Sequence, residues 1–309
     1  MIAAALGGRG ALGHRGRSAL EELDASMQRL LELGAVDCQR HFTSIDGRRL
    51  HHLESGSGPT LLLLHGAGGG AANWYRLIAP LSRHYRVLVP DLPGYGFSDA
   101  IEPRAPLGQH VADVVSRWLH TIGVRRTHVV ATSFGSLVAL RLAERMDVGR
   151  IVITDAVGLS SRMSWLLRLG TGPLISRFVV APTRRGTRAL LRHVLTAAPL
   201  DPVHEDALAD YLYWSARHGD VAMMARAFSR FAGWSGQHDV VTADQLAVLA
   251  DRLLLVWGEQ DDFLPIAHVQ DSCRLAGCNP IRIIPGAGHS PNWEQPGQLL
   301  NVIQEFLSE

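Results

Sequence analysis

Residues 127–135 read Thr-His-Val-Val-Ala-Thr-Ser-Phe-Gly, an apolar run that passes directly into small and polar residues. The run at 127–131 has the length and composition of a buried β-strand, and helical periodicity begins just after Ser133. A sharp turn from strand to helix leaves little room beside its central residue, and the small Ala131 and Gly135 on either side meet that requirement. The stretch therefore predicts a strand–turn–helix unit that projects the Ser133 hydroxyl.

The same alternation of apolar runs and helix-like segments extends along the chain. We expect strands at 60–64, 86–90, 127–131, 150–154, 252–257 and 280–284, and a hairpin at 40–54 that turns at Asp46-Gly47. We expect helices at 18–33, 74–83, 108–122, 134–146, 267–276 and 296–308. Such alternation predicts an α/β fold with a parallel, doubly wound sheet, whose active groups gather at the carboxyl ends of the strands.

Two intervals of the chain depart from this alternation. Residues 1 to about 18 are rich in Gly, Ala and Arg without periodicity, and we interpret them as a mobile leader. The interval from about 157 to 240 has at least three helix-like stretches and no convincing strand, so we expect a helical insertion that covers the strand ends.

Lysine is absent, because all 30 residues counted as Lys+Arg are arginine. A Schiff-base lysine, a lysine general base and a Walker-type phosphate loop are therefore excluded. With 29 Asp+Glu the net charge is +1, which gives no electrostatic case for a nucleic-acid partner.

Metal and membrane sites find little support in the sequence. Cys38, Cys273 and Cys278 are too few and too poorly spaced for a zinc site or a disulfide framework, and the 15 histidines show no ligand spacing. We therefore expect no metal. No apolar run is long enough for a transmembrane span, and the N-terminus lacks the apolar core of a signal peptide, so we expect a cytoplasmic protein.

A glycine-rich loop, His65-Gly66-Ala67-Gly68-Gly69-Gly70, follows the strand at 60–64. A backbone with so few side chains can turn amide groups toward an oxygen that becomes negative during acyl transfer. A phosphate loop is the rival interpretation, and the absence of lysine removes its Walker form. The loop therefore predicts an oxyanion-binding site.

An acid and a histidine follow the last two expected strands. Asp261 comes after the strand at 252–257, and His289 comes after the strand at 280–284. The carboxyl ends of neighbouring parallel strands meet at one edge of the sheet, so both side chains can reach Ser133. The order Ser, Asp, His is the one that such folds use.

Five motifs then occur together and in order. They are His65-Gly66, the stretch 91–99 (Asp-Leu-Pro-Gly-Tyr-Gly-Phe-Ser-Asp), the turn at Ser133, Gly258-x-x-Asp261-x-x-x-Pro265 and Gly286-x-Gly288-His289. From about Arg40 to its end the chain thereby resembles the α/β-hydrolase superfamily. The resemblance implies a mostly parallel eight-stranded sheet flanked by helices, with a helical cap inserted after the sixth strand. It also implies a serine nucleophile, in place of the aspartate of epoxide hydrolases and haloalkane dehalogenases.

On this basis the chain is expected to divide into four parts. A leader and a short helix occupy 1–35, the first part of the core 36–155, the helical cap 156–240 and the second part of the core 241–309.

Roles for the site residues follow from the chemistry of acyl transfer. His289 is expected to take the proton of Ser133 and later deliver it to the leaving group, while Asp261 holds the imidazole tautomer. The backbone amides of Phe134 and Ala67 are expected to bind the oxyanion. This mechanism requires no cofactor.

The choice of acid has two alternatives. Asp262 is adjacent to Asp261, but the spacing to Pro265 favours Asp261. Asp155, at the end of the strand at 150–154, occupies the position of the acid in some relatives and more often marks the exit into the cap.

The closing segment has a finer resemblance. Residues 257–265 and 288–294 look like those of the carbon–carbon bond hydrolases that cleave meta-cleavage products of aromatic degradation. Those relatives carry Asn before the serine, where this chain has Thr132, and a cap arginine that binds the substrate carboxylate, for which Arg217 is a candidate. Trp293 is a second candidate for substrate binding. A serine esterase or lipase-like enzyme remains the first hypothesis, carbon–carbon hydrolysis the second and a non-catalytic binder the third.

The first part of the expected cap is strongly basic. Residues 156–200 contain seven arginines and no acid, interleaved with apolar residues such as Trp165 and Phe178. One interpretation is a mouth for an anionic or amphiphilic ester, or a patch that touches anionic lipid. The other is a set of amphipathic helices with solvated arginines.

Overall fold

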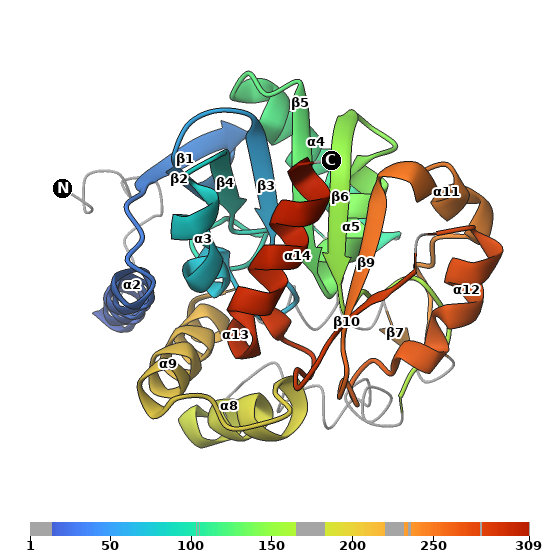
Figure 1. The fold of residues 1–309 in the computed structure, drawn as a ribbon. Coiled ribbons are helices and arrows are strands. Elements are labelled where there is room, and N and C mark those ends of the chain that lie inside the picture. The colour runs from blue at the N-terminus through green and yellow to red at the C-terminus, as the bar shows by residue number, and fades with distance from the viewer. Residues whose placement is uncertain are drawn as a thin grey trace.

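The computed structural model describes residues 14–102, 104, 106–164, 183–219, 232–233, 236–278 and 280–308. An eight-stranded sheet runs through the centre of the molecule (Figure 1). Its strands lie in the order β1 (Gln39–Ile45), β2 (Arg48–Ser55), β4 (Arg86–Pro90), β3 (Thr60–Leu64), β5 (Arg126–Thr132), β6 (Asp147–Thr154), β9 (Leu253–Gly258) and β10 (Arg282–Ile284). β2 pairs antiparallel with β1 and β4, and the other pairings are parallel. The expected hairpin and parallel strands are confirmed.

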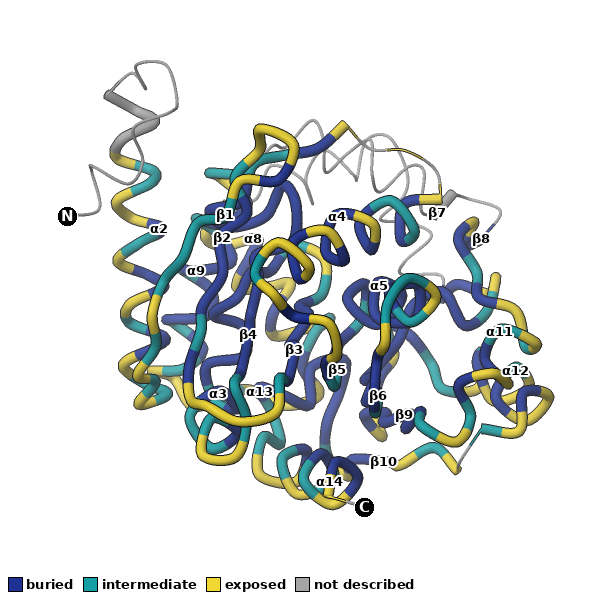
Figure 2. Tube along the Cα trace, turned by 90° about the horizontal axis from the view of Figure 1, so that it is seen from above, coloured by how far each residue is buried: buried dark blue, intermediate teal, exposed yellow. Residues whose placement is uncertain are grey.

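Helices cover both faces of the sheet (Figure 1). One core layer forms against α4 (Leu107–Thr121), α5 (Phe134–Leu142), α11 (Ala243–Ala247) and α12 (Gln270–Leu275). The other forms against α2 (His14–Leu33), α3 (Tyr75–Leu81), α9 (Pro202–His218) and α14 (Pro296–Ser308). Along β3, Leu62 and Leu64 face the first layer while Leu61 and Leu63 face the second. A strand buried on both faces therefore reads as a continuous apolar run, and Figure 2 shows the central strands as buried tubes.

Three expected helices have different bounds in the structure. α2 begins at His14, earlier than the 18–33 that we expected, because its first turn has none of the apolar residues that periodicity detects. α5 ends at Leu142 rather than near 146. The helix expected at 267–276 is divided into a 3₁₀ turn, η4 (Ile266–His268), and α12. Most of the expected leader lies outside the described residues.

The chain between β6 and β9 contains most of the helices that lie near the serine end of the sheet in the part that the structure describes. It forms α8 (Arg184–Leu190), the π-helical turn η2 (Leu191–Leu195) and α9, which lie at the end of the sheet where the parallel strands finish (Figure 1). A short antiparallel pair, β7 (Ala232–Gly233) with β8 (Gly236–Gln237), corrects our expectation of no strand in this interval. Two-residue strands are too short for alternation to reveal them.

The remaining elements are short connections around the sheet. They are η1 (Ala71–Trp74), η3 (Ala250–Arg252) and α13 (Pro291–Glu294). Among the described helices, none combines the length and apolar character needed to cross a membrane.

Candidate active site

Ser133 lies on a strained turn between β5 and α5. Its backbone has φ 51° and ψ −118°, a conformation that is uncommon for a residue with a side chain. A Cβ atom added to Gly135 would lie 2.5 Å from the carbonyl oxygen of Leu64, and one added to Gly66 would lie 3.1 Å from the Ser133 Cβ. The chain therefore needs minimal side chains at these positions, as the expected strand–turn–helix unit requires.

A continuous chain of hydrogen bonds joins Ser133 to a buried carboxylate. The Ser133 Oγ lies 3.1 Å from His289 Nε2, and His289 Nδ1 lies 2.9 Å from Asp261 Oδ2. The Leu264 backbone N–H donates to the other oxygen of Asp261 at 2.8 Å. Asp261 is buried whereas Asp262 is exposed, so the acid that reaches His289 is Asp261. In the matching tautomer the imidazole Nδ1–H donates to Asp261 and Nε2 accepts from the serine hydroxyl.

Glu294 holds the loop that carries His289, a role that we did not derive from the sequence. Its carboxylate accepts the backbone N–H groups of Gly288 at 2.9 and 3.0 Å, Ser290 at 3.3 Å and Ala197 at 2.7 Å. Burial raises the pKa of Glu294, and these donors oppose that shift. The Glu294 carboxylate thus ties the histidine loop to the segment that precedes α9. The sequence feature that could have pointed to Glu294 is its position at the end of the stretch 288–294.

The glycine loop lies directly beside the serine. His65 is buried, with Nδ1 2.8 Å from the Gly66 carbonyl oxygen and Nε2 accepting the Leu92 N–H at 2.9 Å. Burial lowers the pKa of His65, so the neutral ring is favoured and its Nδ1 carries the proton. His65 therefore shapes the loop through these two hydrogen bonds. Ala67 follows Gly66 in this loop, and Phe134 begins α5 directly after the serine.

Asp91 connects three segments around this loop. It accepts the N–H of Ala71 at 2.6 Å and that of Phe97 at 2.8 Å, and its Oδ2 lies 2.7 Å from His51 Nδ1. Burial would raise the pKa of Asp91, but His51 and the Phe97 N–H hold it below its usual value. Asp91 begins the 91–99 motif, for which the sequence suggested no individual role.

Comparison with known proteins agrees with the observed fold. Residues 61–302 match the model of the family described as the alpha/beta hydrolase family. The chain belongs to this family. The resemblance inferred from the motifs is thereby confirmed, as is the fold.

Individual relatives of this α/β-hydrolase have different activities. The dihydrolipoyllysine-residue acetyltransferase component of an acetoin cleaving system from Cupriavidus necator is 30% identical over 268 residues, 86% of this chain and 68% of the relative. The 2-hydroxy-6-oxo-6-phenylhexa-2,4-dienoate hydrolase of Burkholderia cepacia is 24% identical over 84% of this chain and 91% of the relative. A membrane phospholipase A, described as a bacterial virulence factor, has a TM-score of 0.75 and 26% identity, covering 99% of this chain and 94% of that one.

Helix α9 of the hydrolase contacts the glycine loop. The Ser215 hydroxyl donates to the Gly69 carbonyl oxygen at 3.0 Å, and the Tyr211 hydroxyl accepts the Ala72 N–H at 3.4 Å. Arg217 lies on the same helix with an exposed side chain. These contacts place the helical insertion against the loop beside Ser133, and no local sequence signal pointed to them.

Trp293 belongs to a packed layer. Its side chain is buried in the core beside α3 and α14, and its indole N–H donates to the Asn73 carbonyl oxygen at 2.9 Å. Substrate contact by Trp293 or Arg217 stays a prediction.

Three arginines of the described part of the insertion pair with acids. Arg184 pairs with Asp210, Arg188 with Asp206, and Arg192 Nη2 lies 2.6 Å from Glu205 Oε1. The three acids all lie on α9, beyond the acid-free stretch 156–200, so α9 offsets part of the positive charge of α8 and η2. Residues 165–182, which include Arg168, Arg177, Trp165 and Phe178, lie outside the described residues.

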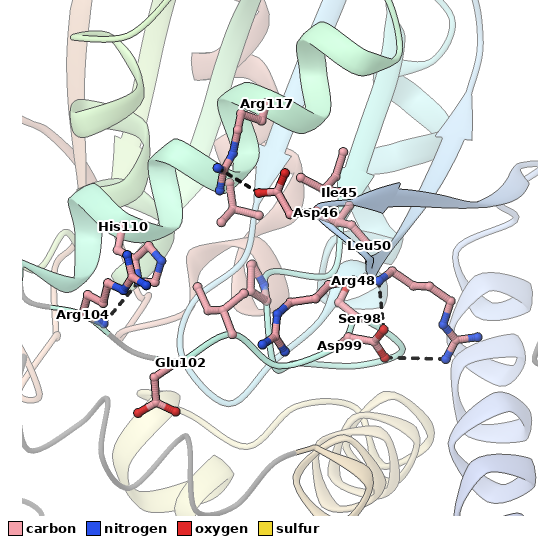
Figure 3. Close-up of a pocket in the computed structure, with 14 residues that line it drawn as sticks. Ile45, Asp46, Arg48, Leu50, Ser98, Asp99, Glu102, Arg104, His110 and Arg117 are labelled. Atoms are coloured by element: carbon pink, nitrogen blue, oxygen red, sulfur yellow. Dashed lines mark hydrogen bonds and ion pairs between the residues drawn. The ribbon is translucent and has the colours of Figure 1, made fainter. Parts of the chain in front are cut away.

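A cavity of about 290 Å³ lies between the β1–β2 hairpin, the loop after β4 and α4 (Figure 3). Its lining includes Arg49 and Arg117, which pair with Asp99 at 3.6 Å and with Asp46 at 2.9 Å. The residues that line it do not include Ser133. This cavity is therefore distinct from the site around Ser133.

Proposed function

We propose that this α/β-hydrolase is a serine hydrolase that cleaves a carboxylic ester through an acyl-enzyme intermediate. The observation that carries the proposal is the hydrogen-bond chain from Asp261 through His289 to the Ser133 Oγ. A serine hydroxyl becomes an effective nucleophile when a neighbouring base removes its proton, and the base in turn needs an orienting acid. The strained turn and the adjacent glycine loop support the same assignment.

The proposed reaction proceeds in two halves. His289 Nε2 takes the proton as Ser133 Oγ attacks the ester carbonyl, and the same proton then goes to the departing alcohol. Water, activated by His289, attacks the acyl-serine and releases the carboxylic acid. Asp261 stabilises the imidazolium in both halves. The backbone N–H groups of Phe134 and Ala67 are the proposed oxyanion donors, and the loss of one such donor typically costs about 3 kcal/mol.

We propose an apolar or amphiphilic small-molecule ester as the substrate, with residues 156–240 as the cap that selects it. The contacts of α9 with the glycine loop and of Glu294 with Ala197 support a cap role, because they connect the insertion to both sides of the site. The related phospholipase supports an ester substrate.

The test is hydrolysis of a short aryl ester with release of a coloured phenol. Ser133→Ala is expected to lower kcat/KM by at least about 10⁴-fold, because nucleophile and base act as a unit. Ser82→Ala, which removes a hydroxyl from the far end of α3, is the matched control and is expected to match the wild type. A fluorophosphonate is expected to label Ser133 of the wild type and to leave Ser82 unlabelled. Full activity of Ser133→Ala would contradict the proposal, and an unlabelled wild type would favour the non-catalytic binder.

Carbon–carbon bond hydrolysis is the second candidate. The specific observation in its favour is the 24% identity to the dienoate hydrolase over 91% of that protein, together with the resemblance of residues 257–265 and 288–294. The assay follows the absorbance of a yellow ring-fission dienoate. Decay of that absorbance, without turnover of any ester in a panel of varied chain length and charge, would replace the ester proposal with this one.

A further inference from the structure

Asp155 is a fully buried carboxyl group that the proposed mechanism does not use. It follows the last residue of β6 and has a backbone φ of 45°, in the left-handed region. Its N–H donates to the Val256 carbonyl oxygen at 3.1 Å, and its Oδ1 accepts the Gly258 N–H at 2.9 Å. These two bonds to β9 hold both the backbone and one side-chain oxygen in place.

The other oxygen of Asp155 lies in an environment of acceptors. Carboxylate oxygens of Asp155 and Asp261 and a ring nitrogen of His289 all lie within 4.8 Å of one another. Asp155 Oδ2 is buried and accepts no hydrogen bond from the residues that the structure describes, while both oxygens of Asp261 already accept one. Two ionised carboxylates cannot satisfy one another, because a carboxylate only accepts. A single proton between them removes the repulsion and supplies the missing donor.

We propose that Asp155 is held protonated and that its Oδ2–H donates to the carboxylate of Asp261, which makes Asp155 a positioning residue for the Ser133–His289–Asp261 chain. The inference rests on the proposed function for its consequence, since it concerns how Asp261 is oriented toward His289. The inference that Asp155 carries a proton depends only on the buried pair of carboxyl groups.

The charged groups that face Asp155 support this protonation state. Burial raises the pKa of Asp155 well above its ordinary value, and Asp261 and then Glu294 add to that rise. The Gly258 N–H opposes it. His289, the one basic group of this cluster, is engaged by Asp261 and Ser133. Asp155 therefore differs from the alternative triad acid that we considered from the sequence, because it supports Asp261 and does not replace it.

Asn is the closest neutral copy of a protonated Asp. In Asp155→Asn the amide oxygen can still accept the Gly258 N–H, and the amide NH₂ can still donate to Asp261. In Asp155→Ala both bonds are lost. We expect the rate of fluorophosphonate labelling of Ser133 to stay within about threefold of wild type in Asp155→Asn and to fall about tenfold or more in Asp155→Ala. Asp262→Asn is the control, because Asp262 follows Asp261 in the sequence and is exposed. Ser133 of this variant is expected to be labelled at the wild-type rate.

Infrared difference spectra of the full-length protein provide a readout that does not depend on activity. The wild type at neutral pH is expected to show the C=O band of a protonated carboxylic acid that Asp155→Asn lacks and Asp262→Asn retains. Absence of that band, or a loss of labelling in Asp155→Asn as large as in Asp261→Asn, would overturn the proposal. A protein that shows the band but cleaves no ester would overturn the proposed function and leave the shared proton standing.

Discussion

Glycine at position 135 allows α5 to approach the end of β3. The space that a side chain would need is occupied by the carbonyl oxygens of Leu64 and His65, at 2.5 and 2.7 Å from an added Cβ. Backbone atoms at this edge of the sheet cannot move aside as a flexible side chain can. The small residue is thus required by the close approach of two elements that lie far apart in the sequence.

Gly135→Ala is expected to lower the free energy of unfolding by about 1–3 kcal/mol, because it forces overpacking against the main chain. Thermal unfolding followed by circular dichroism measures the effect. Gly297→Ala in α14 is the matched control, since an added Cβ there meets nothing within 4 Å. That control is expected to be neutral or stabilising by up to about 1 kcal/mol. An unchanged midpoint for Gly135→Ala would contradict the steric argument.

Helix α9 is the element that connects the insertion to the rest of the molecule. Its buried side contacts the glycine loop through Ser215, and it packs along α2. Asp206 on α9 pairs with Arg29 of α2 at 3.0 Å and also with Arg188 of α8. One acid therefore joins three helices at a surface where the side chains are 42–45% exposed.

A double-mutant cycle of Arg188→Ala and Asp206→Ala is expected to give a small coupling energy. Exposed ion pairs contribute about 0.2–1 kcal/mol, and salt screens them. Chemical denaturation with urea at low and at 1 M sodium chloride measures the coupling, which is expected to shrink as salt rises. A coupling that is insensitive to salt would show that the contact is not primarily ionic.

A buried histidine in the antiparallel part of the sheet is expected to make folding sensitive to acid. His52 of β2 stacks on His41, with ring centroids 5.0 Å apart, and lies edge to face with Trp118, also with ring centroids 5.0 Å apart. Burial, followed by the nearby His41, lowers the pKa of His52 to about 3. Between that value and the pKa of about 6.5 of an unfolded histidine, the unfolded chain binds a proton that the folded protein does not.

The free energy of unfolding is therefore expected to fall as pH decreases from about 6.5 toward 3. His52→Phe keeps a ring in the core and removes this linkage, so the slope of stability against pH is expected to decrease by about 1.4 kcal/mol per pH unit within that window. Acid titration followed by tryptophan fluorescence measures it. The same substitution at the exposed His84 should leave the slope at its wild-type value. An unchanged slope in His52→Phe would mean that His52 is not the group that senses acid.

Much of this architecture could be predicted because local sequence patterns specify it. The leucine run of β3, the turn at Ser133 and the order of Ser133, Asp261 and His289 all appear within a few residues or as simple spacings. The bounds of α5 and the short β7–β8 pair were not predicted, because helix ends and two-residue strands depend on packing with distant segments.

The order of amino acids was enough to predict the alternating strands and helices, the family and the candidate nucleophile, base and acid, because hydrophobic periodicity and turn chemistry act over a few residues. Which charged groups meet became visible in the folded chain alone. It brought the acids of α9 to the arginines of α8, and it placed Asp155 beside Asp261 across neighbouring parallel strands. Such pairings depend on the order of the strands in the sheet and on the burial of each charged group. Neither the strand order nor the burial can be inferred from the residues that flank a charged group in the sequence.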